Sequence, residues 1–215
     1  MNFENIAVLT SKESWFIPYA EQFVDDLRGK GCHTGLFHNY KDIDSRFQIV
    51  FILSYFSIIK EECLRKHKHN LVVHESQLPQ GRGWAPLFWQ ILEGKNKIPA
   101  VLFEATEGVD TGDIYISDYI TLQGDELHDE IRDLQAKKSV EMCMQFLDNY
   151  DNLKPVSQRG METFYARRTP KDSQMDINKS ISEQFNLLRI ASNEDYPAFF
   201  HHKGSKYILK IFKDE

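Results

Sequence analysis

A histidine and a carboxylate, each in a glycine-containing turn, are the residues best suited to chemistry in this chain. His74 ends a short apolar run and opens a loop rich in glycine and proline that extends to Pro86. Asp110 follows 36 residues later, in a second turn that contains Gly112. Imidazole titrates near neutrality, so His74 can transfer a proton or donate to a developing oxyanion, and a nearby carboxylate would orient it. We predict that His74 and Asp110 form an acid/base pair.

Simpler interpretations apply to His74 itself and to other polar residues. A histidine after a strand is commonly a hydrogen-bonded structural residue, and Asp113 suits an Asx-type turn between two strands. The pairs His67/His69 and 201–202 lack the cysteine or carboxylate spacing of a metal site, so none is expected. We expect His67 and His69 to lie at the solvated end of a helix.

Apolar runs alternate with amphipathic stretches over the first 150 residues. Strands are expected at 6–9, 32–37, 47–53, 70–73, 98–105 and 113–122, and helices at 15–27, 58–66, 84–93 and 126–149. Thr10 and Ser11 are expected to cap the first helix. Continuous apolar strands are typical of parallel sheets that are covered on both faces. The pattern predicts an α/β fold with a Rossmann-like, doubly wound, mostly parallel sheet, whose ligands bind beyond the carboxyl ends of the strands.

The character of the sequence changes after about residue 153. Residues 1–153 are predicted to form the domain that carries the site, and residues 154–215 a small C-terminal appendage. The appendage is expected to contain a short helix near 181–190 and a β-hairpin over 196–211 that turns at Gly204. The hairpin could pair across a two-fold axis in a homodimer, or pack on its own domain.

Composition limits the classes of partner. The chain has 215 residues and a net charge of −6. A negative net charge weighs against a role that depends on binding the phosphate backbone of a nucleic acid. Three widely spaced cysteines suit a reducing compartment. The sequence shows no signal-peptide pattern and no run of 18 apolar residues. We therefore expect a cytoplasmic protein without a membrane or nucleic-acid partner.

The loop after His74 resembles a family motif. The chain resembles the folate-dependent formyltransferase superfamily over roughly residues 1–150. The motifs that carry this resemblance are residues 74–89, the Leu-Glu-Gly at 92–94 and residues 109–114. The family pattern is Asn-x-His-x-Ser-x-Leu-Pro-x-x-Arg-Gly, with an Asp-x-Gly about three dozen residues after the histidine. Members act on methionyl-tRNA, glycinamide ribonucleotide or sugar nucleotides. One departure is Val72, which stands where the family has an asparagine that helps to hold the oxyanion.

The resemblance implies a reaction and a set of roles. The formyl donor would be 10-formyltetrahydrofolate. His74 would stabilise the oxyanion and supply a proton, and Asp110 would orient His74 and take the proton of the attacking amine. The residues expected to bind the folate are Ser54, Tyr55, Phe56, Ile58, Gly108 and Asp110. The residues expected to bind the acceptor are Lys12, Ser76, Arg82, Gly83 and Trp84.

Two of the acceptor residues are candidates for nucleotide phosphates. Lys12 lies in the loop after the first strand, and Arg82 lies in the glycine loop. Lys12 equally suits a solvated lysine at the start of a helix.

The C-terminal segment narrows the choice of formyl acceptor. Residues 165–172, 186–189 and 196–200 are similar to the tail of the sugar-nucleotide N-formyltransferases, whereas methionyl-tRNA formyltransferases carry a longer basic domain. The sequence of the loop after His74 is similar to that of formyltransferases associated with pseudaminic-type nonulosonic acid pathways. The resemblance thus implies formylation of an amino-dideoxy sugar nucleotide, UDP- or dTDP-linked for example, in the synthesis of cell-surface or flagellar glycans.

Other functions stay open at this point. One is formylation of another amine, such as an aminoacyl-tRNA or glycinamide ribonucleotide. A second is hydrolysis of the formyl-folate to release formate. A third is a folate- or nucleotide-binding protein that has lost catalysis, which Val72 suggests.

Overall fold

A six-stranded mixed sheet forms the centre of the computed structural model, which describes residues 3–214. The strands are ordered β2-β1-β3-β4-β6-β7. All neighbouring pairs from β2 to β4 are parallel, whereas β6 is antiparallel to both β4 and β7. The strand bounds are β1 Asn5–Leu9, β2 His33–Phe37, β3 Ile49–Ile52, β4 His69–His74, β6 Lys97–Glu104 and β7 Ile114–Thr121. The expected mostly parallel α/β sheet is confirmed.

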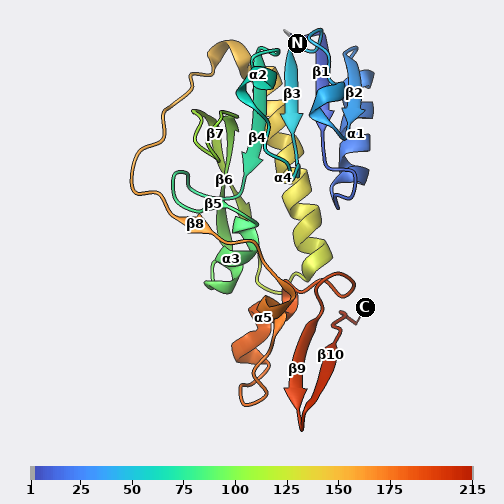
Figure 1. Cartoon of the computed structure of the whole chain (residues 1–215), viewed down its shortest axis with the longest axis vertical. Helices are drawn as coiled ribbons and strands as arrows, with labels where there is room; N and C mark the ends of the chain where they lie inside the picture. Colours follow the sequence, from blue (N-terminus) through green and yellow to red (C-terminus); the bar gives the residue numbers. More distant parts are fainter. Residues whose placement is uncertain (1–2, 215) are drawn as a thin grey trace.

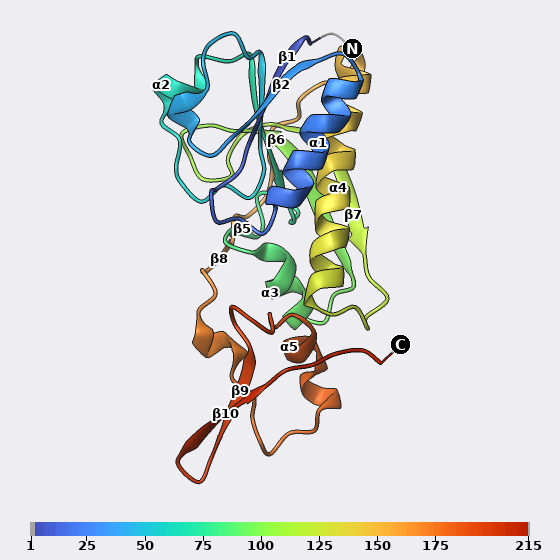
Figure 2. The same cartoon turned by 90° about the vertical axis from the view of Figure 1, so that its right-hand side faces the viewer.

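The three longest helices cover one face of this sheet. The helix bounds are α1 Ile17–Gly29, α2 Glu61–Leu64, α3 Pro86–Leu92, α4 His128–Asn149 and α5 Phe185–Arg189. Figure 2 shows α1 and α4 side by side on the same face. Alternate strand residues such as Val8, Phe51 and Leu71 pack against these two helices and α3 in the largest apolar cluster. Burial of this kind is the main favourable contribution to folding.

The opposite face of the sheet is covered by loops and short turns of helix. Leu9, Val50 and Ile52 pack there against Tyr40 and Leu64, which come from the connections on either side of β3. The predicted helix over 58–66 shrinks to the single turn α2. Residues 54–60 instead form an irregular connection that leads away from the carboxyl end of β3.

Two local expectations are wrong. Helix α1 has Phe16 at its N-cap position, and the hydroxyl of Ser14 accepts a hydrogen bond from the Phe16 N–H. Thr10 and Ser11 therefore do not cap this helix. Their side chains instead contact the connection after β3, where the Ser11 hydroxyl accepts a bond from the Phe56 N–H at 2.8 Å.

His67 and His69 are buried rather than solvated, at 8% and 9% exposed. The Nδ1 of His67 donates to the carbonyl of Phe47 at 2.7 Å, and His69 bonds Glu104 and Tyr150 at the amino end of β4. These contacts come from residues distant in sequence, so no local pattern indicates them.

The chain after α4 returns along the sheet before it forms the appendage (Figure 1). Val156 bridges to Ile114, and β8 Phe164–Tyr165 pairs in parallel with β5 Arg82–Gly83 in the glycine loop. Helix α5 and the hairpin of β9 Ala198–His202 and β10 Ser205–Leu209 then lie beyond α3. The division at residue 153 and pairing of the hairpin in a homodimer stay predictions. Among residues 3–214, no helix is both long and apolar enough to cross a membrane.

Candidate active site

His74 is the last residue of β4, and its side chain is almost fully enclosed. The residue is 6% exposed, and its Nε2 lies 2.8 Å from the carbonyl oxygen of Gly81. A carbonyl oxygen only accepts hydrogen bonds, so Nε2 carries a hydrogen. The arrows of β3 and β4 in Figure 1 point to the end of the sheet where β5, β8 and α3 lie. The structure thus presents a ring N–H group at the carboxyl edge of the sheet.

Asp110 lies beside His74, although 36 residues separate them. Its Oδ2 is 3.8 Å from the Nε2 of His74 and accepts a hydrogen bond from the Gly83 N–H at 2.9 Å. The backbone of Asp110 is left-handed, with φ of 53°, a conformation that aspartate adopts more readily than most residues. The carbonyl of Asp110 accepts a bond from Gln158 at 2.8 Å. Side chain and backbone are therefore both held in place.

Glycine is required where the loop meets β8. A Cβ on Gly83 would lie 2.5 Å from the carbonyl oxygen of Tyr165, and its φ is +97°. The N–H of Gly81 donates to the hydroxyl of Thr163 at 2.8 Å. A Cβ on Gly112 would lie 1.7 Å from the carbonyl oxygen of Glu104. These close backbone approaches bring the two turns of the site together.

Val72 shares the face of β4 on which His74 lies, since side chains alternate along a strand. It packs against the buried apolar residues Leu78 and Phe103. Asn70, two residues earlier, is 3% exposed, and its amide group bonds the Leu64 carbonyl and the Tyr40 hydroxyl. Neither residue therefore supplies an amide donor at the histidine.

The residues expected to bind folate lie on two neighbouring connections. Ser54 is left-handed, with φ of 53°, and starts the connection after β3. Phe56 and Ile58 follow it and are 49% and 82% exposed, whereas Tyr55 is half-buried against the core. Gly108 precedes Asp110 and packs against the side chain of Thr111. Exposed apolar surface beside a fixed turn is suited to a flat ring.

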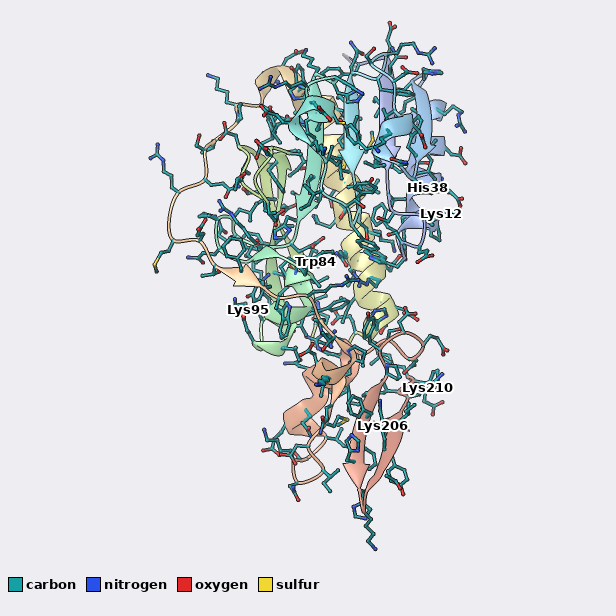
Figure 3. The ribbon with its side chains drawn as sticks, viewed as in Figure 1. Lys12, His38, Trp84, Lys95, Lys206 and Lys210 are labelled. Atoms are coloured by element: carbon teal, nitrogen blue, oxygen red, sulfur yellow. The ribbon has the colours of Figure 1, made fainter. Side chains whose placement is uncertain are left out.

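The residues expected to bind the acceptor are spread over a wider area. Ser76 is 2% exposed, and its hydroxyl has no hydrogen-bond partner among the described residues. Lys12 is exposed and lies beside His38, at a distance from Trp84 (Figure 3). Trp84 is 40% exposed and has Phe56 and the guanidinium of Arg167 for neighbours, with the Arg167 Cζ 4.9 Å from its ring centroid.

Arg82 has partners within the chain. Its side chain is 10% exposed, and its Nη1 lies 2.5 Å from a carboxylate oxygen of Glu162. Its Nη2 donates to the amide oxygen of Gln158 at 2.8 Å. The guanidinium thus points to the segment after α4, and its role toward a phosphate stays a prediction.

Gln158 is the residue of the site that sequence reasoning missed. Its amide nitrogen donates to the carbonyls of Asp110 and Gly112, both at 2.8 Å, while its oxygen accepts from Arg82. It therefore ties the aspartate turn to the glycine loop. The stretch around Gln158 has no periodicity or motif, so no signal in the sequence could have identified it.

Tyr165, which was predicted only as part of the tail, completes the glycine loop. Its hydroxyl donates to Glu93 at 2.7 Å, and burial together with this carboxylate raises the pKa of the phenol. Across residues 3–214, no group of three or more histidine, cysteine, aspartate or glutamate side chains is arranged to hold a metal ion.

Together these features define an α/β protein with a histidine–aspartate pair at the carboxyl edge of its sheet. The family model described as formyl transferase matches residues 40–147, which include His74, the glycine loop and Asp110. The match spans half of the sequence. The chain belongs to the formyl transferase family.

Two relatives that match by sequence are methionyl-tRNA formyltransferases. The one from Clostridium acetobutylicum is 28% identical over 144 residues, which are 65% of this chain and 46% of the relative. The one from Rickettsia prowazekii is 30% identical over 176 residues, which are 81% of this chain and 57% of the relative. The chain thus spans about half the length of the relatives that it matches.

Solved structures share the fold. A methionyl-tRNA formyltransferase from Clostridium thermocellum matches with a TM-score of 0.80 and 22% identity, over 98% of this chain and 94% of that one. A sugar N-formyltransferase from Shewanella matches with a TM-score of 0.71 and 13% identity, over 98% of both chains. HypX from Aquifex aeolicus, in complex with tetrahydrofolic acid, matches with a TM-score of 0.78 and 16% identity, over 96% of this chain and 37% of that one.

Proposed function

We propose that this chain is a folate-dependent N-formyltransferase that formylates the amine of an amino-dideoxy sugar nucleotide. The observation that carries the proposal is the Nε2 of His74, which bears a hydrogen and lies 3.8 Å from an immobilised aspartate. Membership of the formyl transferase family supports the reaction class.

His74 would donate a hydrogen bond to the formyl oxygen, and would then supply the proton that the folate nitrogen needs when its bond to the formyl carbon breaks. Its Nε2–H is directed to the Gly81 carbonyl, and a small rotation of the ring lets it donate to the formyl oxygen instead. As the amine attacks, negative charge develops on that oxygen, and a donor in an enclosed site stabilises this charge strongly. Val72 supplies no second donor, so His74 has a larger share of the task than in relatives with asparagine there.

Asp110 acts as the base. Its Oδ2 accepts from the Gly83 N–H and still faces His74, so it can orient the imidazole and take the proton that leaves the amine. The bonds from Gln158 and Gly83 fix the carboxylate before substrate arrives, which reduces the entropy lost on reaction.

The connection after β3 and the aspartate turn fit a folate. Bound 10-formyltetrahydrofolate supplies the formyl group. The exposed apolar surface of Phe56 and Val109, at 49% and 50% exposed, offers a flat ring a place to stack. Ser54 and Asp110 both have positive φ, so the backbone turns sharply at each of them. The tetrahydrofolic acid complex of HypX supports the same class of ligand.

The sequence of the C-terminal segment and the net charge of the chain support an amino-sugar nucleotide as the acceptor. Residues 165–172 are similar to sugar-nucleotide enzymes, and a net charge of −6 disfavours a large polyanion such as tRNA. A relative named for sugar N-formylation shares the fold over 98% of this chain. The pseudaminic-type pathway is the finer form of the same proposal. Methionyl-tRNA is the second candidate, because two relatives that match by sequence are named methionyl-tRNA formyltransferase.

The test is a screen of amino-sugar nucleotides with 10-formyltetrahydrofolate, read as the mass gain of one formyl group. We expect His74→Ala to lower turnover by at least a factor of about 1000, since it removes both the oxyanion donor and the acid. Binding of 5-formyltetrahydrofolate and the unfolding temperature should stay close to wild type. Turnover of His74→Ala equal to wild type would overturn the assignment, and formate release without acceptor would indicate a hydrolase.

A further inference from the structure

Two arginines from distant parts of the chain lie around one phenylalanine ring. Arg132, in the first turns of α4, has its Cζ 4.4 Å from the ring centroid of Phe88 in α3. Arg168, which follows β8, has its Cζ 5.8 Å from the same centroid. On its other side Arg132 lies 4.3 Å from the ring of Trp15. A cation–π arrangement holds each guanidinium in a fixed position.

Neither guanidinium has a carboxylate partner. Within residues 3–214 no ion pair of 4.0 Å or shorter involves Arg132 or Arg168, and the Nε of each is buried without a hydrogen-bond partner. Among the described residues, Arg132 donates one hydrogen bond, to the amide oxygen of Gln135, and Arg168 has two contacts of 3.5 Å, to the backbone carbonyl of Asp172 and the hydroxyl of Ser173. Burying an unpaired charge costs several kcal/mol, so such a pair is expected where an anion completes it.

The electrostatics agree with this geometry. Burial lowers the pKa of Arg132 to about 10. The negative charge of Glu75 opposes this shift, the positive charge of Arg168 adds to it, and Asp195 and Asp129 oppose it more weakly. Burial also lowers the pKa of Arg168. His128 stacks on Phe88 at 5.5 Å, so a third basic side chain faces the ring, with Asp129 as its hydrogen-bond partner.

The arginine pair connects directly to the candidate active site. Gln135, the partner of Arg132, donates to the carboxylate of Glu75 at 2.7 Å, and Glu75 follows His74 in the chain. Trp15 belongs to the segment after β1 that also carries Lys12. Both arginines are half-buried and keep part of their surface exposed. An anion between them would therefore lie beside the carboxyl end of β4.

We propose that Arg132 and Arg168 bind the diphosphate of the nucleotide-linked acceptor. Guanidinium groups bind phosphate oxygens in a bidentate manner, and two of them match the two phosphates of a nucleoside diphosphate. The site deepens the proposed function, on which it rests, because it places the nucleotide between α3, α4 and the segment after β8. The amino sugar then extends toward His74.

The test measures binding of uridine 5′-diphosphate, thymidine 5′-diphosphate and inorganic pyrophosphate to the full chain by calorimetry at constant ionic strength. We expect Arg132→Gln and Arg168→Gln each to weaken all three about tenfold or more, because a charged hydrogen bond contributes on that order. Binding of uridine and of 5-formyltetrahydrofolate should not change. Arg159→Gln is the matched control, since Arg159 is exposed on the same segment after α4.

A structural role for the arginines predicts a different result. Removal of one of two neighbouring cations should leave the unliganded unfolding temperature of Arg168→Gln unchanged or raised, whereas a structural arginine would lower it. If Arg132→Gln does not fold, Arg132→Lys keeps the charge and reports on the bidentate geometry through the same titrations. Diphosphate affinities equal to wild type in the variants, or loss of folate binding instead, would overturn the proposal. Intact diphosphate binding without any formyl transfer would overturn the proposed function and leave this site standing.

Discussion

At the scale of single residues, Gln158 shows how the site is held. Its amide satisfies two carbonyls, those of Asp110 and Gly112, and accepts from Arg82. We expect Gln158→Ala to leave both carbonyls unpaired, which costs about 1–3 kcal/mol of stability. Turnover should fall on the order of tenfold, because Asp110 loses its fixed position.

Steady-state kinetics and urea unfolding measure the two effects. Gln158→Glu is a second, more specific variant. It keeps the shape of the side chain and the contact with Arg82 but removes the two N–H groups that donate to the carbonyls of Asp110 and Gly112. If Gln158→Glu behaves as wild type, the amide nitrogen has no positioning role.

His67 makes a separate prediction about pH. Burial lowers the pKa of His67 below its ordinary value of 6.5, and its Nε2 is buried without a partner among the described residues. The unfolded chain therefore binds a proton more readily than the folded one, so stability is complete above about pH 7 and falls as the pH drops through 6.5. Burial lowers the pKa of His128 in the same direction.

The measurement is the free energy of unfolding in urea at pH 7.5, 6.5 and 5.5. His67→Asn keeps a donor for the Phe47 carbonyl but does not titrate, so its loss of stability between pH 7.5 and 5.5 should be smaller than that of wild type. One group contributes at most about 1.4 kcal/mol per pH unit. Parallel pH profiles of the two proteins would show that His67 already titrates freely when folded.

At the scale of elements, the short pairing of β5 with β8 determines whether the site forms. Gly83 donates to Asp110 and lies so close to Tyr165 that a Cβ would be 2.5 Å from its carbonyl oxygen. We expect Gly83→Ala to separate the two strands and displace Asp110, with turnover lower on the order of 100-fold. The cost in stability should be about 2 kcal/mol or more.

Gly94→Ala provides the control for backbone strain. Gly94 ends α3 with φ of +87°, but a Cβ there would meet open space. This variant should lose about 1 kcal/mol of stability and keep its turnover. Equal effects of the two substitutions on turnover would indicate that strain, rather than the contact with Tyr165, explains the loss in Gly83→Ala.

The elements also show what sequence could predict. Continuous apolar runs identified β1, β3 and β4 to within two residues at most boundaries, because strands covered on both faces leave that pattern. The pair β5 and β8 could not be predicted, since each has two residues and they are joined across 80 positions of chain.

The candidate site likewise contains residues that sequence could predict and residues that it could not. His74 and Asp110 stand in a motif, and the structure places them together, whereas Gln158 acts through contacts that only the folded chain creates. His67 and His69 show the limit of local reasoning most clearly. The charged residues around them suggest solvent exposure, yet both rings are buried and bond partners that are distant in sequence.

At the scale of the whole molecule, charge is unevenly divided between the two parts of the chain. Residues 154–215 contain 11 lysines and arginines against 8 acidic residues, whereas residues 1–153 contain 15 against 24, so the acidic excess behind the net charge of −6 lies entirely in residues 1–153. That acidic part carries His74, Asp110 and the connections around them. A long phosphate backbone would have to approach this part to present an amine at His74, and the field there is unfavourable. A small diphosphate needs only the local pair Arg132 and Arg168.

We therefore expect initiator methionyl-tRNA to be a poor acceptor in comparison with an amino-sugar nucleotide. Filter binding of tRNA between 50 and 200 mM salt should show weak affinity and a shallow dependence on salt, because few phosphates would be neutralised. Formylation of methionyl-tRNA should be at least about 100-fold slower than that of the best amino-sugar nucleotide at equal concentration. A steep salt dependence together with efficient formylation of methionyl-tRNA would show that tRNA is the acceptor. The roles of His74 and Asp110 would stand unchanged, because attack by an amine on a formyl group needs the same donor and base with either acceptor.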